Sequence, residues 1–148
     1  MKPPDRARRW AAIALVTYAA LITVIGIVPR PIDWGLTPWI RGLLATLHRH
    51  GLRGWIDYDA FELASHVMLF VPFGILAVVA LGRRLAWLAV LAGLGMSALV
   101  EFGPALLGSE HPPSGLDLFL NAIGAVIGTA IGYRVLAPRA PAGVTTAP

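Results

Sequence analysis

The stretch LDLFLNAIGAVIGTAIGYRVLA, residues 116–137, decides the fold class of this protein. It is almost entirely apolar, and a helix of that length spans the roughly 30 Å hydrocarbon core of a bilayer at a rise of about 1.5 Å per residue. Glycines at positions 124, 128 and 132 recur every fourth residue, a spacing that lets membrane helices approach closely. The stretch therefore predicts a transmembrane helix that packs tightly against a neighbour.

Three other apolar runs are long enough to cross a bilayer, at residues 10–28, 63–82 and 85–103. Over the 148 residues, 57% are hydrophobic and 14% are charged, whereas a soluble domain has about 25% charged residues. So few polar side chains cannot cover a water-facing surface, which argues against a soluble enzyme, a disordered chain and a nucleic-acid-binding module. The sequence predicts an all-α membrane domain of four spans over residues 1–137, followed by a disordered, proline-rich tail over residues 138–148.

Lysine and arginine predict the orientation of the spans, because cytoplasmic loops carry an excess of both residues. If the amino terminus is inside, eight of the twelve fall on the cytoplasmic side: Lys2, Arg6, Arg8, Arg9, Arg83, Arg84, Arg134 and Arg139. The basic charge is thus a topology signal, and no nucleic-acid partner is predicted. We expect both termini in the cytoplasm, and we expect the first run to remain as an anchor because residues 27–29 make a poor cleavage site.

The first outer connection, residues 29–62, is too long for a bare linker. Thr37 and Pro38 have the residue types of a helix cap and a first helical position, and Gly51 is typical of a helix end. Between them, residues 38–50 are predicted to form a helix whose apolar face consists of Trp39, Ile40, Leu43, Leu44 and Leu47. Two interpretations stay open: a helix lying in the interface of the outer leaflet, or a lid packed on the bundle.

Polar side chains within the spans are expected to converge near the outer leaflet. Each of the last three spans carries a carboxylate, an imidazole or an amide at its outer end, and ionisable groups in membrane helices are costly and face the bundle interior. The sequence therefore predicts an outward-facing polar pocket between the second, third and fourth spans. Its candidate ligand-binding residues are Glu62, His66, Glu101, His111, Ser114, Asp117 and Asn121, with Ser114 also expected to cap the fourth helix.

Small residues below this polar level predict how the spans pack. They recur every fourth residue on the third and fourth spans, and the simplest arrangement places these two faces against each other. The predicted packing residues are Gly93, Ser97, Gly124, Gly128 and Gly132.

Other roles for the polar residues stay open. They have a purely structural interpretation, since interhelical hydrogen bonds contribute about 0.6 kcal/mol each and set helix register. A metal site of His66, Glu101, His111 and Asp117 lacks any motif spacing such as HExxH, so no metal and no cofactor are predicted. The serines lack the context of a nucleophile, and no catalytic residue is assigned. An intramembrane enzyme that uses Glu101 or Asp117 as acid or base is an alternative.

Three segments resemble the VanZ-like family of membrane proteins, in the order in which that family has them. HVMLFVPFG at residues 66–74 resembles its N-hhhF-hP-hG span, where h is apolar. SALVEF at residues 97–102 resembles its S-xxx-E segment, and PSGLDLFLNAIG at residues 113–124, followed by Gly128, resembles its D-xxx-N-xx-G-xxx-G helix. The resemblance covers residues 60–133 and implies a multi-pass bacterial protein of the cytoplasmic membrane.

The sequence departs from the family pattern at three positions. His66 stands where the family usually has asparagine, Pro104 where glutamine is common, and His111 where arginine is usual. If the family's polar groups bind one ligand, these changes alter its charge preference or abolish its binding. The name-giving member is associated with low-level resistance to the glycopeptide antibiotic teicoplanin, so the resemblance implies a role in the cell envelope.

The leading hypothesis is a binding or accessory protein that engages an envelope lipid, a peptidoglycan-related ligand or an amphiphilic drug in the outward-facing pocket. The lipid bilayer is its expected environment, and the glycine face fits a second copy of the chain or another membrane protein. A structural subunit of a larger membrane complex is the remaining alternative.

Overall fold

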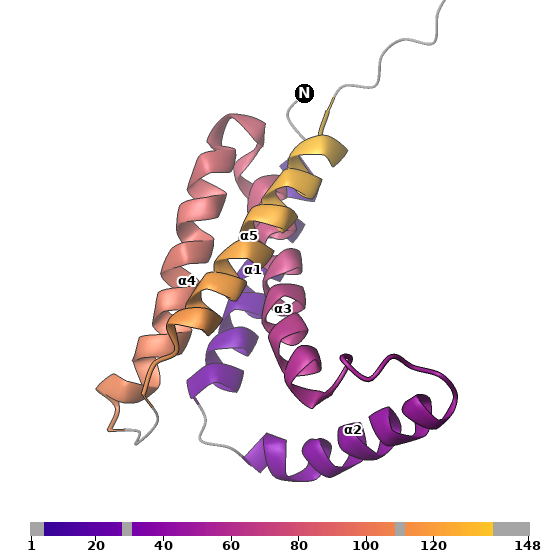
Figure 1. The fold of residues 1–148 in the computed structure, drawn as a ribbon. Coiled ribbons are helices and arrows are strands. Elements are labelled where there is room, and N and C mark those ends of the chain that lie inside the picture. Colours follow the sequence, from indigo (N-terminus) through magenta and orange to yellow (C-terminus); the bar gives the residue numbers. More distant parts are fainter. Residues whose placement is uncertain (1–4, 28–30, 109–111, 138–148) are drawn as a thin grey trace, which may run out of the picture.

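The computed structural model describes residues 5–27, 31–108 and 112–137, and their regular structure is helical throughout. The elements in chain order are α1 (Asp5–Ile27), α2 (Pro31–Arg49), α3 (Tyr58–Leu81), the 3-10 turn η1 (Arg83–Leu85), α4 (Ala86–Leu106) and α5 (Gly115–Val135). Four of them run alongside one another as a bundle, and α2 lies across one end of it (Figure 1). The predicted tail at residues 138–148 lies outside the described residues.

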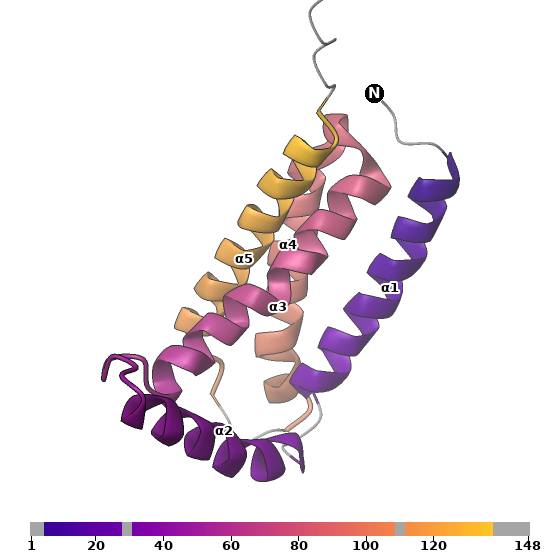
Figure 2. The same cartoon turned by 90° about the vertical axis from the view of Figure 1, so that its right-hand side faces the viewer.

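Four helical segments are long and apolar enough to cross a membrane, which confirms the predicted all-α architecture of four spans. They are α1, α3, α4 with η1, and α5. The start of α1, the turn between α3 and α4, and the end of α5 lie at one end of the bundle, whereas α2 lies at the other (Figures 1 and 2). The turn between α3 and α4 is thus separated by the length of the bundle from α2, which lies between α1 and α3 in the chain.

Several helices begin before the apolar runs that indicated them. α3 begins at Tyr58 rather than at residue 63, because Asp57 caps it and accepts a hydrogen bond from the backbone N–H of Ala60 at 2.9 Å. α1 likewise begins at Asp5 and includes the basic residues that precede its apolar run. An apolar run marks the part of a helix inside the membrane, whereas capping groups determine where the helix itself begins.

Two predicted boundaries at prolines are wrong. α2 begins at Pro31, so Thr37 is not its cap and Pro38 lies inside the helix. α4 does not end at residue 103 but continues through Pro104 to Leu106. A proline inside a helix removes one backbone donor without ending it when the neighbouring bonds persist, as in membrane helices. The expected end of α2 is confirmed, since Gly51 has a φ of +99°.

The closest approach in the bundle is between α3 and α5, along the glycine row of α5. A Cβ atom on Gly128 would lie 2.9 Å from the carbonyl carbon of Val71, and one on Gly124 would lie 2.9 Å from Cβ of Phe70. From the other side, a Cβ on Gly74 would lie 2.7 Å from the backbone nitrogen of Thr129. Glycines on both helices therefore bring the two backbones into contact.

The expected pairing of the small faces of the third and fourth spans is consequently wrong. The glycine row faces α3, and α4 packs on a neighbouring strip of α5, with Gly93 against the side chain of Ala125. Gly74 and Gly128 each meet backbone atoms of the opposite helix, whereas Gly93 of α4 meets the methyl group of Ala125, so α3 and α5 approach more closely than α4 and α5. All five predicted packing residues are nevertheless buried, among them Ser97 at 0% exposure.

α1 completes the bundle by contacts with α3 and α4. The Tyr18 hydroxyl donates to the backbone carbonyl of Leu69 at 2.8 Å, and Arg8 Nε donates to that of Ala80 at 3.1 Å. Ile22 of α1 is fully buried in a core cluster with residues of α3 and α5: Phe70, Phe73 and Ala125. These contacts of α1 do not involve the polar ends of α3, α4 and α5, which face one another.

Candidate functional site

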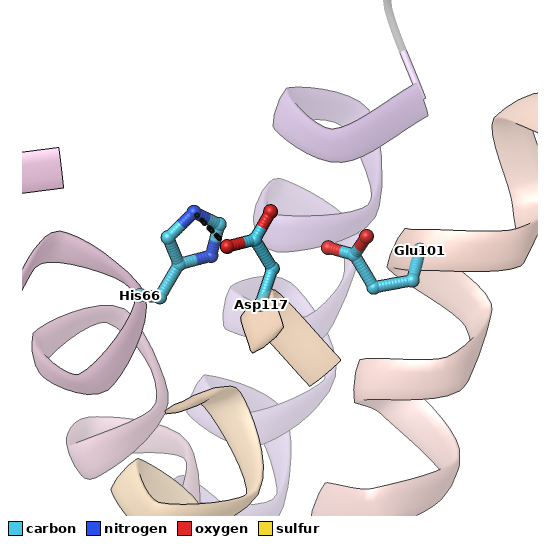
Figure 3. Close-up of side chains that lie close together, drawn as sticks. All are labelled: His66, Glu101 and Asp117. Atoms are coloured by element: carbon cyan, nitrogen blue, oxygen red, sulfur yellow. Dashed lines mark ion pairs between the residues drawn. The ribbon is translucent and has the colours of Figure 1, made fainter. Parts of the chain in front are cut away.

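Three helices carry polar side chains to the end of the bundle beside α2. His66 lies in the third turn of α3, Glu101 near the end of α4, and Asp117 in the first turn of α5. Figure 3 shows their side chains extending toward one another, with Asp117 between His66 and Glu101. Together with Ser114 and Asn121 of the same region, they form what we call the polar cluster.

The start of α5 organises this cluster. Ser114 caps the helix, as expected, because its Oγ accepts a hydrogen bond from the backbone N–H of Asp117 at 3.1 Å. The backbone N–H of Ser114 in turn donates to Oε2 of Glu101 at 3.1 Å. This second bond ties the end of α4 to the start of α5, and it leaves the other carboxylate oxygen of Glu101 without a role in the cap.

His66 connects α3 to α5 through both of its ring nitrogens. Nδ1 lies 3.2 Å from Oδ1 of Asn121, and Nε2 lies 3.5 Å from Oδ1 of Asp117. One ligand atom from each of His66, Glu101 and Asp117 lies within 4.8 Å of the other two. The side chains of His66 and Asp117 are 24% and 29% exposed, so the cluster is accessible from outside the bundle.

The charges of the cluster do not balance. Two carboxylates face one imidazole, and among the described residues no lysine or arginine lies within ion-pair distance of Glu101 or Asp117. The cluster therefore favours a positively charged group close to its oxygens.

Asn121 lies deepest in the cluster, and its burial has a consequence. It is 1% exposed, and its amide nitrogen is buried without a hydrogen-bond partner among the described residues. A buried donor without an acceptor is costly, so such groups commonly face a bound molecule or a water. One turn from Glu101 on α4, the Ser97 hydroxyl donates to the backbone carbonyl of Leu118 at 3.1 Å, which closes the cluster toward the bundle interior.

Two of the seven predicted ligand-binding residues are not in this arrangement. Glu62 is exposed and lies one helical turn before His66 in α3, outside the group of side chains that meet around Asp117. The spacing of Glu62 and His66 places them on one face of α3, but it does not say which turn of the neighbouring helix each one meets. His111 lies outside the described residues.

Chemically, the cluster offers acceptor oxygens and an imidazole at one partly open place. Carboxylates accept hydrogen bonds from ammonium groups and bind divalent cations, and an imidazole nitrogen serves as a ligand or a donor. The sequence had indicated every residue of the cluster but not their mutual geometry.

Comparison with known proteins places the chain in a family. No curated protein and no solved structure matches it. The VanZ/LLP1 family, in contrast, matches residues 15–136. That match covers well over half of the chain and includes the second half of α1, the α3, α4 and α5 spans and the whole polar cluster, so this protein belongs to the VanZ/LLP1 family.

Proposed function

We propose that this membrane protein binds the polar head of an envelope amphiphile at the polar cluster. The observation that carries the proposal is the meeting of His66, Glu101 and Asp117 from three different helices, with ligand atoms within 4.8 Å, at a partly exposed end of the bundle. Ionisable groups in membrane helices are costly, and they commonly mark sites of binding or transport. An envelope lipid, a peptidoglycan-related ligand and a glycopeptide are the classes of amphiphile that we consider.

The distribution of charge supports a site on the outer side of a bacterial cytoplasmic membrane. Arginines gather at the end of the bundle opposite to the polar cluster, at the start of α1, in η1 and at the end of α5: Arg6, Arg8, Arg9, Arg83, Arg84 and Arg134. Because cytoplasmic ends of spans are enriched in basic residues, both termini would be inside and the cluster outside.

The surface of α2 supports an interfacial position for this helix rather than a lid. Trp39, Leu43 and Leu47 on its apolar face are 65%, 44% and 42% exposed, and Leu44 is the buried member of that face. A lid would bury the row against the bundle, whereas an interfacial helix turns it toward acyl chains. α2 would then lie beside the entrance of the cluster, where an amphiphile has its head group.

The proposal is tested by thermal unfolding of the purified, detergent-solubilised protein. Short-chain phosphatidylethanolamine, short-chain phosphatidylglycerol and teicoplanin serve as probes, each titrated in buffer with EDTA and in buffer with Zn²⁺. At about 100 times its Kd, a ligand stabilises the folded protein by about 2.7 kcal/mol, which raises the unfolding midpoint by several degrees. We expect a saturable shift with at least one probe, and we expect it to be lost in Glu101→Gln and in Asp117→Asn.

Glu62→Gln is the matched control, since it removes a carboxylate from the same end of α3 outside the polar cluster. It should retain the full shift. Equal shifts in the wild type and in both cluster variants would contradict the proposal, as would the absence of any shift with the three probes. Aggregation of both variants would show that the polar cluster holds the helices together, and this outcome too would contradict a binding role.

A further inference from the structure

We infer that His66, Glu101 and Asp117 bind a divalent metal ion that takes both nitrogen and oxygen ligands, such as Zn²⁺ or Mn²⁺. The inference rests on the proposed site, but not on the amphiphile that the site binds. Zinc and manganese suit a mixed set of imidazole and carboxylate ligands. The sequence spacing did not predict a metal, because motif spacings describe ligands on one segment and these three come from three helices.

The geometry of the three ligands fits an ion of this kind. Around a tetrahedral zinc with ligand distances of about 2.0–2.1 Å, neighbouring ligand atoms are about 3.4 Å apart. Nε2 of His66 and Oδ1 of Asp117 are 3.5 Å apart, and the ligand atom of Glu101 lies within 4.8 Å of both. The side chain of Glu101 rotates about several single bonds, so its oxygen can move from this separation to a tetrahedral ligand distance.

Asn121 supports the assignment of Nε2 as the metal ligand. Metal-bound histidines usually donate their other ring N–H to an oxygen, which determines the tautomer and the orientation of the ring. Oδ1 of Asn121 lies 3.2 Å from Nδ1 of His66 and fills this position. With the proton on Nδ1 of a neutral ring, the lone pair of Nε2 faces Oδ1 of Asp117, and these two electron-rich atoms repel each other. A cation between them would bind both atoms and remove this repulsion.

The remaining contacts agree with a bound cation. A divalent ion supplies the positive charge that two carboxylates without a lysine or arginine partner require. Oε2 of Glu101 accepts from the backbone N–H of Ser114, an outer hydrogen bond of the kind that orients metal-binding carboxylates. Three protein ligands leave a fourth position open, and the exposure of His66 and Asp117 places it toward the outside. A phosphate or carboxylate of a head group would complete the ion's coordination there.

Metal binding by the full-length protein, stripped with EDTA and kept in detergent without added lipid, tests the inference. Zn²⁺ alone is titrated by calorimetry, and Co²⁺ alone is followed by its visible absorption, whose intensity reports the coordination number. We expect one ion per chain and a low-coordinate cobalt spectrum in the wild type and in Glu62→Gln. His66→Ala, Glu101→Gln and Asp117→Asn should each weaken Zn²⁺ binding by more than 100-fold, and Asn121→Ala by about 10–100-fold.

A thermal unfolding curve of each stripped variant separates loss of metal from loss of fold. Stoichiometric binding that is equal in the wild type and in Asp117→Asn would overturn the inference, and so would wild-type binding no tighter than that of His66→Ala. The two proposals fail separately. If an amphiphile binds the stripped protein in EDTA and Zn²⁺ does not bind, only the metal site falls; if Zn²⁺ binds and no amphiphile does, only the proposed function falls.

Discussion

Gly128 and Gly95 show how differently a single glycine can act in these helices. Gly128 lies where α5 crosses α3, and a Cβ there would lie 2.9 Å from the carbonyl carbon of Val71. Gly95 lies in the middle of α4, and a Cβ there would have no neighbour within 4 Å. The first glycine permits a close approach of two backbones, whereas the second only lowers the helix propensity of its segment.

Opposite effects on stability are therefore expected from the same substitution. Gly128→Ala should lower the free energy of unfolding by about 1–3 kcal/mol, because the added methyl group forces α3 and α5 apart. Gly95→Ala should leave it unchanged or raise it by up to about 1 kcal/mol. Unfolding of the detergent-solubilised variants by increasing denaturant measures both, and a Gly128→Ala variant as stable as the wild type would refute the close α3–α5 contact.

Among the helices, α5 is the one whose first turn most directly determines the arrangement of the polar cluster. The Ser114 hydroxyl satisfies the backbone N–H of Asp117, and the position of this first turn decides which residues of α3 and α4 lie level with it. Glu62 lies one helical turn, or about 6 Å along the axis, before His66 and is exposed outside the polar cluster. At α2, by contrast, the apparent start signal at Thr37 and Pro38 is overridden by a helix that begins at Pro31.

Removal of the cap should loosen α5 without unfolding the bundle. Ser114→Ala is expected to cost about 1 kcal/mol in the free energy of unfolding, because it leaves the N–H of Asp117 without its acceptor. Ser114→Thr retains a hydroxyl and should stay within a few tenths of a kcal/mol of the wild type. Hydrogen exchange of the backbone amides at the start of α5 provides the local measurement, and unchanged exchange in Ser114→Ala would argue against the cap.

For the whole molecule, the two ends of the bundle differ in charge and in chemistry. Basic residues gather at the end with the start of α1 and the end of α5, where the guanidinium of Arg83 also lies 4.0 Å from the centre of the Tyr133 ring. The polar cluster and α2 occupy the opposite end. In a membrane this asymmetry predicts one orientation, with the cluster outside.

The chain has no cysteine, which makes this orientation easy to test. Gly54→Cys introduces a thiol between α2 and α3, and Ala137→Cys introduces one just beyond α5; both positions are exposed. In intact cells, a membrane-impermeant maleimide should label Gly54→Cys, whereas Ala137→Cys should be labelled only after permeabilisation. The reverse pattern would place the polar cluster on the cytoplasmic side and would contradict the proposed role in the cell envelope.

The sequence by itself determined the four spans, the level at which polar residues gather and the cap at Ser114, because hydropathy, helical period and capping are properties of a single segment. Tertiary structure alone decided that the glycine row of α5 meets α3 instead of α4, that Glu62 is left out, and that His66 lies between Asn121 and Asp117. These outcomes depend on which faces of the three helices contact one another and on the register in which the helices pack. The close backbone contact at Gly74 and Gly128 sets that register, and no single segment contains it.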